Sequence, residues 1–179
     1  MTKFIGIDHI DNLSKSGHDN LYVLIAGGMA AGKSFVVNST IKTIPIFDID
    51  DIMIKREFLE YTRDQFAMAM DEISKMVDSH MESKLSIVAM GTASNTTVAI
   101  DRLHAAKMKG YTTILVHIDA PISQAIEQNV HRLKKGERGV ALSEEHKIER
   151  TSIGAAQTVA ILRESLLVDY FVYYNNARN

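Results

Sequence analysis

The residues from Gly27 to Ser34 have the types and spacing needed to bind phosphate. They read G-G-M-A-A-G-K-S and fit G-x-x-x-x-G-K-[ST], the P-loop pattern. Glycines let backbone N–H groups turn towards phosphate oxygens, and the start of a helix adds partial positive charge. In such a loop Lys33 reaches the β- and γ-phosphates, and the Ser34 hydroxyl holds Mg²⁺. The pattern predicts a site for ATP and Mg²⁺ formed by Gly27, Gly28, Met29, Ala30, Ala31, Gly32, Lys33, Ser34 and Phe35.

The segments on either side of this loop support the same interpretation. Leu21–Ala26 is a short apolar run typical of a buried strand, and residues 35–41 can continue as a helix. Strand, glycine-rich loop and helix in this order are what phosphate binding requires. The alternative is a glycine-rich turn before an ordinary helix, and the flanking segments favour the phosphate site.

Three carboxylates, Asp48, Asp50 and Asp51, follow the next apolar run. Phosphoryl transfer to a hydroxyl needs a carboxylate that orients the acceptor and takes its proton. We expect Asp50 to be this base, with Asp48 as the alternative, acting through metal or substrate. Asp51 opens an apolar-periodic stretch and is expected to be a helix N-cap. Thr92, after the third strand of the expected sheet, is a further candidate for contact with the acceptor.

A basic segment at residues 131–139 carries four Lys or Arg residues against one Glu and contains two glycines. In a phosphotransferase, arginines on such a segment can close over ATP and stabilise the transferring phosphoryl group, because the guanidinium matches phosphate oxygens. Arg132 and Arg138 are the expected catalytic members of this lid. The alternative is a solvated charged loop, and that interpretation suits Lys134 and Lys135 equally well.

Composition sets limits on the class of protein. The chain has 179 residues, a formal net charge of −2 and no cysteine. Disulfides, thiolate catalysis and Cys-ligated zinc are therefore excluded, and purely electrostatic binding of nucleic acid is disfavoured. We find no apolar run long enough to span a membrane and no signal-peptide pattern at the N-terminus, so we expect a cytoplasmic setting and no membrane partner.

Apolar runs alternate with amphipathic stretches, which predicts an α/β fold with a mainly parallel sheet. The expected strands are residues 21–26, 44–47, 85–90, 112–118 and 170–174. The expected helices are residues 33–41, 51–60, 63–83, 96–109, 122–134 and 144–167. This describes a three-layer P-loop NTPase fold with a five-stranded sheet flanked by helices. We expect residues 1–20 to form an N-terminal arm, with residues 4–7 as a candidate short strand, and residues 21–179 a single kinase domain, with the lid at about residues 131–143.

The ordered set of motifs resembles the small P-loop kinases related to zeta toxins and polynucleotide kinases. Beyond the P-loop, the match covers "D-x-D" at residues 47–52, the strand ending in Gly-Thr at residues 87–92, "GY" at residues 110–111, the lid, and the closing "D-x-hydrophobic-x-x-Y-x-N" at residues 169–176. The resemblance implies an ATP-dependent kinase with an alcohol group as acceptor. One position departs from it: Met90 stands where zeta toxins have an acidic residue that helps hold a sugar nucleotide.

A second resemblance is to bacteriophage kinases that phosphorylate 5-hydroxymethyluracil in DNA, which are similar in size and general composition. Its acceptor would be a hydroxymethyl group on an extruded base, in phage DNA within the host cytoplasm. The alternatives are a polynucleotide 5′-hydroxyl kinase, a zeta-toxin-like UDP-N-acetylglucosamine kinase, and a non-enzymatic nucleotide-binding module.

Overall fold

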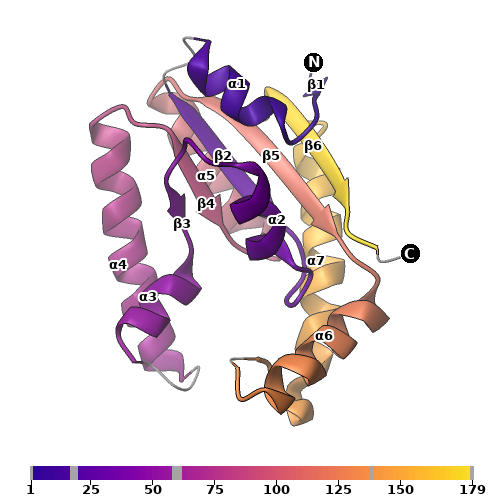
Figure 1. Cartoon of the computed structure of the whole chain (residues 1–179). Helices are drawn as coiled ribbons and strands as arrows, with labels where there is room; N and C mark the ends of the chain where they lie inside the picture. Colours follow the sequence, from indigo (N-terminus) through magenta and orange to yellow (C-terminus); the bar gives the residue numbers. More distant parts are fainter. Residues whose placement is uncertain (1, 17–19, 58–61, 138, 178–179) are drawn as a thin grey trace.

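The protein folds around one parallel sheet. The computed structural model describes residues 2–16, 20–57, 62–137 and 139–177. Within these ranges the sheet has six strands in the order β1-β6-β5-β2-β4-β3 (Figure 1), and every neighbouring pair is parallel. The strands are β1 (Lys3–Phe4), β2 (Leu21–Ala26), β3 (Ile46–Phe47), β4 (Ile87–Met90), β5 (Thr112–Asp119) and β6 (Tyr170–Asn175).

Helices cover both faces of this sheet, because side chains of successive strand residues point to opposite faces. Leu21, Val23 and Ile25 of β2 pack in one apolar cluster with α1 (His9–Lys15) and α2 (Lys33–Thr40). Tyr22 and Leu24 belong to the other cluster, which lies against α4 (Arg63–Glu82), α5 (Thr96–Met108) and α7 (His146–Leu162). The remaining helices are α3 (Ile49–Lys55), α6 (Ile122–Lys134) and the 3-10 turn η1 (Leu142–Glu144).

The expected α/β architecture is confirmed, and the strand β2 and the helix α6 have the bounds that the sequence predicted. The sheet gains one more strand than expected, because Lys3 and Phe4 pair with Tyr170 and Phe171 of β6. The described part of the expected N-terminal arm packs on the domain: Ile10 of α1 is fully buried. In the part of the chain that the structure describes, we find no helix that is both long and apolar enough to cross a membrane.

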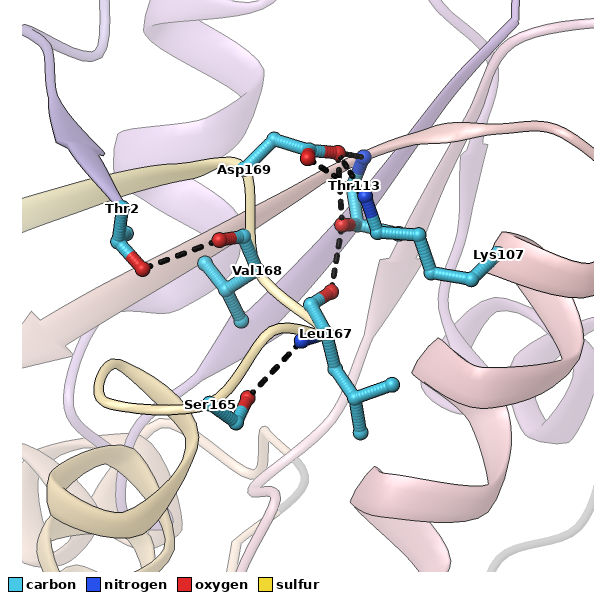
Figure 2. Close-up of polar contacts among 7 residues, drawn as sticks. All are labelled: Thr2, Lys107, Thr113, Ser165, Leu167, Val168 and Asp169. Carbon is cyan, nitrogen blue, oxygen red and sulfur yellow. Dashed lines mark hydrogen bonds and ion pairs between the residues drawn. The ribbon is translucent and has the colours of Figure 1, made fainter.

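The amino ends of β5 and β6 are joined by a polar network around Asp169 (Figure 2). Lys107 Nζ lies 2.5 Å from both carboxylate oxygens of Asp169, and the Thr113 N–H donates to the same carboxylate at 2.8 Å. The Thr113 hydroxyl donates to the Leu167 carbonyl at 2.6 Å. Burial alone would raise the pKa of Asp169, but the hydrogen bonds from Lys107 and Thr113 outweigh it and hold the pKa below its ordinary value.

Replacing Asp169 with alanine should lower the free energy of unfolding at pH 7 by about 1–3 kcal/mol, the range for hydrogen bonds to a charged group. The pair is partly exposed, so the lower half of that range is expected. Because the folded pKa lies below the unfolded one, this stability is complete well above pH 4 and disappears as pH falls through the folded pKa.

Urea unfolding at pH 7 and in acid measures this contribution. The matched control is Asp71→Ala, because Asp71 pairs with Lys75 on an exposed helical face, where solvent screens the pair and its loss should cost much less than the loss of Asp169. Equal losses in the two variants, or an Asp169 loss that does not shrink as the pH is lowered from 7 into strong acid, would contradict the assignment.

Candidate active site

The phosphate-binding loop leaves the carboxyl end of β2, which lies between β5 and β4 within the sheet (Figure 1). Proteins with parallel sheets of this kind bind their ligands outside the carboxyl ends of the strands. Gly32 forms the N-cap of α2 with φ 80°, a left-handed conformation that L side chains rarely adopt. Ala30 also has positive φ, at 56°. The loop thus turns sharply into α2, so the first N–H groups of that helix are available to an anion.

Helix α7 packs against the loop through Thr151 and Ser152, a contact that the sequence analysis did not predict. The Met29 N–H donates to the Thr151 hydroxyl at 3.0 Å. A Cβ placed on Gly28 would lie 2.0 Å from Ser152 Oγ, so only glycine fits there without displacing Ser152. The two helix residues are far from the loop in sequence, and no local pattern marks them.

Lys33 lies folded across the loop. Its Nζ donates to the Gly28 carbonyl at 2.8 Å and to the Gly27 carbonyl at 3.2 Å. Burial lowers the pKa of Lys33 to about 8, although the charges of Asp48 and Asp50 act in the opposite direction. Phosphate oxygens can replace the two carbonyls and would favour the charged amine.

ATP affinity should therefore fall as pH rises through about 8, where the free Lys33 amine loses its proton. If only the protonated amine binds phosphate, the affinity at pH 9 should be about tenfold lower than at pH 7, with proton uptake on binding near pH 8. Calorimetry in buffers of different ionisation enthalpy measures both quantities. Binding that is independent of pH and takes up no proton would show that Lys33 is fully charged before ATP arrives.

The acidic cluster lies beside the loop, and its members Asp48 and Asp50 are half-buried, whereas Asp51 is exposed. Ser34 Oγ donates to Asp48 Oδ2 at 3.2 Å, and Asp48 Oδ1 accepts from the Asp50 N–H at 3.1 Å. Asp48 is therefore the N-cap of α3, and the expectation that Asp51 would be the cap is wrong. Burial raises the pKa of Asp48, and so do the neighbouring charges of Asp50 and Asp51, against the two hydrogen bonds. Asp50 lies in the first turn of α3, and its charge acts on both Lys33 and Asp48.

The donor set beside the loop suits Mg²⁺. Ser34 and Asp48 present a hydroxyl and a carboxylate 3.2 Å apart at the phosphate edge, and Mg²⁺ prefers such oxygen ligands together with water and substrate phosphates. Among the residues described, no group of three or more His, Cys, Asp or Glu side chains could hold a metal. A nucleotide-bound Mg²⁺ needs none, because the phosphates and water supply the remaining ligands.

The segment that follows β4 contacts the start of the phosphate-binding loop. The Gly27 N–H donates to the Thr92 carbonyl at 3.2 Å, and the Thr92 and Ser94 hydroxyls lie 2.9 Å apart. Thr92 therefore lies next to the start of the loop, and its expected contact with the acceptor stays a prediction. Met90, at the end of β4, is 7% exposed, so this position offers a buried thioether in place of a carboxylate.

The basic segment begins within α6. Arg132 is half-buried there, and its positive charge contributes to the lowered pKa of Lys33, which places it within electrostatic reach of the loop. Lys134 and Lys135 are exposed. Arg138, the second expected arginine, lies outside the described residues. Phe35 is 76% exposed, so its ring is open to solvent, and its expected part in the ATP site stays a prediction.

The buried side-chain amide of Asn129 is hydrogen-bonded to the backbone of Val140, which follows the basic segment. Asn129 of α6 is 1% exposed, its Nδ2 donates to the Val140 carbonyl at 2.8 Å, and its Oδ1 accepts from the Val140 N–H at 2.7 Å. These bonds satisfy both halves of the amide, as burial requires. Asn129 and Val140, which flank the basic segment at residues 131–139, are thus held together by two hydrogen bonds.

The sequence and the fold match known proteins. A family model described as Zeta toxin matches residues 7–179. No curated protein matches the chain significantly.

Solved structures share the fold at low sequence identity. One is a chain of the Pnkp1/Rnl/Hen1 RNA repair complex, with a TM-score of 0.67 and 13% identity over 81% of this chain; the match spans about half of that chain, 47%. Another comes from the PezAT toxin–antitoxin system of Streptococcus pneumoniae, with a TM-score of 0.64 and 15% identity over 92% of this chain and 73% of that one. A third, named only as a candidate kinase from Chloroflexus aurantiacus, has a TM-score of 0.61 and 15% identity, with 89% of each chain covered.

Proposed function

The chain belongs to the zeta toxin family, and from that premise we propose that it is an ATP-dependent kinase that transfers the γ-phosphoryl group to a hydroxyl. The observation that carries the proposal is the meeting of Lys33, Ser34 and Asp48 at the phosphate-binding loop. The Ser34 hydroxyl contacts Asp48, and the Asp48 charge acts on Lys33. This arrangement places the phosphate-binding loop, a cation and a carboxylate together at the carboxyl ends of the strands.

Each of these residues has a role that follows from its chemistry. The N–H groups of the loop and of the first turn of α2 bind the phosphates, and Lys33 neutralises the charge shared by the β- and γ-phosphates. Ser34 and Asp48 would hold Mg²⁺, Asp48 through water, and the ion would supply charge neutralisation at the phosphate oxygens. Arg132 and Arg138 are proposed to complete the positive charge from the lid side.

Asp50 is proposed as the base, because it lies in the first turn of α3 and its charge acts on Lys33 at the loop; Asp48, which contacts Ser34 and caps α3, is the alternative. The acceptor oxygen forms a bond to the γ-phosphorus while the bond from that phosphorus to the β–γ bridging oxygen breaks. The hydroxyl proton passes to the Asp50 carboxylate, and ADP leaves. Thr92 is proposed to contact the acceptor from the neighbouring strand end.

For the acceptor we propose the hydroxymethyl group of 5-hydroxymethyluracil in bacteriophage DNA. Met90 supports a departure from sugar nucleotides, because a buried thioether is a poor partner for a sugar hydroxyl. The exposed Lys134 and Lys135 of the lid can contact the phosphates of a DNA backbone. A polynucleotide 5′-hydroxyl is the second candidate, favoured by the fold shared with a chain of an RNA repair complex. UDP-N-acetylglucosamine and a non-enzymatic nucleotide-binding role remain the alternatives to be tested.

The acceptor is tested with γ-labelled ATP and Mg²⁺ on four substrates offered separately: hydroxymethyluracil DNA, unmodified DNA with a free 5′-hydroxyl, nucleosides and UDP-N-acetylglucosamine. Nuclease digestion then locates the label. Label on internal modified bases is the expected result, and label at 5′ ends would identify a polynucleotide kinase. Label on the sugar nucleotide alone would contradict the inference from Met90.

A Met90→Glu variant sharpens this test. If the methionine excludes sugar nucleotides, the acidic side chain should raise transfer to UDP-N-acetylglucosamine relative to DNA. A Met90→Gln variant, which has similar size and no charge, is the matched control.

A further inference from the structure

The side chain of Asn176 lies against the phosphate-binding loop, although 145 positions in the sequence separate it from Ala31. Its Nδ2 donates to the Ala31 carbonyl at 2.8 Å. Ala31 is 3% exposed, so this carbonyl has little access to water. The same nitrogen lies 2.5 Å from the place where a Cβ on Gly32 would stand. The amide of Asn176 thus packs against the peptide that joins Ala31 to Gly32, on the side of the Ala31 carbonyl.

The backbone of Asn176 is itself held in place. Its N–H donates to the Asp119 carbonyl at the end of β5 at 2.7 Å, and its carbonyl accepts from Gln124 Nε2 of α6 at 2.8 Å. The residue therefore reaches the loop from a position fixed by a central strand and by the helix that carries the basic segment. A side chain held in this way loses little further freedom when it makes its hydrogen bond.

The direction of the bond matters because a trans peptide is planar. The structure has no cis peptide among its described residues, so the Gly32 N–H points away from the Ala31 carbonyl. Holding the carbonyl towards Asn176 consequently directs the Gly32 N–H to the opposite side of the peptide. The left-handed backbone of Ala30 is costly and persists only where surrounding contacts fix it, whereas glycine adopts this conformation readily at Gly32.

We propose that Asn176 is a positioning residue for the phosphate-binding loop: its amide orients the Ala31–Gly32 peptide so that the Gly32 N–H faces the nucleotide phosphates. Asn176 itself need not touch the nucleotide. The inference rests on the proposed function, because it takes the loop to be the ATP site. A hydrogen bond of this kind corresponds to a factor of about 2–12 in an equilibrium constant.

Two neighbouring asparagines allow a matched test. Asn176→Ala removes the amide from the loop, whereas Asn175→Ala removes an amide that, within the described part of the chain, bonds to the Ala177 N–H. Hydrogen–deuterium exchange on the nucleotide-free protein should show faster exchange of a peptide covering residues 28–35 in Asn176→Ala, by about 2–12-fold. The dissociation constant and KM for ATP should rise by a similar factor, with kcat and the acceptor KM within twofold of wild type. Asn175→Ala should match wild type in every measurement.

Asn176→Asp separates orientation from packing, because aspartate keeps the shape and loses the donor. It should weaken ATP binding at least as much as Asn176→Ala; wild-type binding by this variant would overturn the proposal. Unchanged exchange in Asn176→Ala, or equal effects of the two alanine variants, would overturn it as well. Thermal melting of each variant establishes that it is folded. Since exchange is measured without nucleotide, it judges Asn176 even if wild-type protein transfers no phosphoryl group, a result that would count against the proposed function alone.

Discussion

Asp50→Asn is expected to lower kcat for phosphoryl transfer by about 10²–10⁴-fold, the usual contribution of a positioned general base. The dissociation constant for ATP should stay within about threefold of wild type, because the phosphates are bound by the loop and Lys33. The amide keeps the size of the carboxylate and loses its ability to accept the acceptor proton. Single-turnover transfer and ATP binding, measured on the same preparations, provide the two quantities.

Two neighbouring carboxylates serve as comparisons for this experiment. Asp51 is exposed, and Asp51→Asn should retain transfer within about threefold. Asp48 contacts Ser34 and caps α3; because asparagine keeps the capping oxygen, Asp48→Asn should alter the Mg²⁺ dependence of transfer with little change in thermal stability. If Asp50→Asn keeps full activity and Asp48→Asn loses transfer without a change in Mg²⁺ dependence, Asp48 is the base and the present assignment is wrong.

Lys33→Ala should lower kcat/KM for ATP by at least about 10²-fold, since it removes a cation from a site where charge develops during transfer. Both binding and turnover should suffer, because the amine contacts the phosphates in the ground state and in the transition state. Lys33→Arg should not restore activity: the Lys33 amine fits between the Gly27 and Gly28 carbonyls, and a guanidinium is larger and planar.

The matched control for this variant is Lys42→Ala. Lys42 is exposed and lies after the end of α2, away from the loop. Its loss removes the same unit of charge, so an equal fall in activity would mean that net charge, and not the position of Lys33, accounts for the effect.

Much of the fold could be predicted because its signals are local. The apolar run of β2 and the amphipathic pattern of α6 are continuous in sequence, and their bounds were predicted as observed. The start of α3 was misplaced because three aspartates within four residues can each cap a helix, and the sequence does not show that it is the Asp48 carboxylate that accepts from the Asp50 N–H. The pairing of Phe4 with Phe171 could not be seen either, since a two-residue strand has no periodicity.

Part of the candidate site could likewise be predicted from local sequence patterns, and the rest depends on contacts between distant segments. The loop, Asp48, Asp50 and Thr92 were identified because a strand end followed by polar residues is a local pattern. Thr151, Asn129 and Asn176 were not assigned roles there, since each acts through one hydrogen bond to a backbone group of a distant or irregular segment. Asn176 appeared in the sequence only as the last letter of a motif, and its contact with Ala31 depends on the sheet order that places β6 next to β5.

The central claim is that this site moves the γ-phosphoryl group of ATP to a hydroxyl. The most direct test incubates wild-type protein and the Lys33→Ala variant with γ-labelled ATP, Mg²⁺ and hydroxymethyluracil DNA, and separates labelled DNA from free labelled phosphate. We predict label on the DNA as a phosphomonoester, dependent on both Lys33 and the hydroxymethyl group. Label released only as free phosphate at the same rate with and without every acceptor in the panel, or no consumption of ATP at all, would contradict the account.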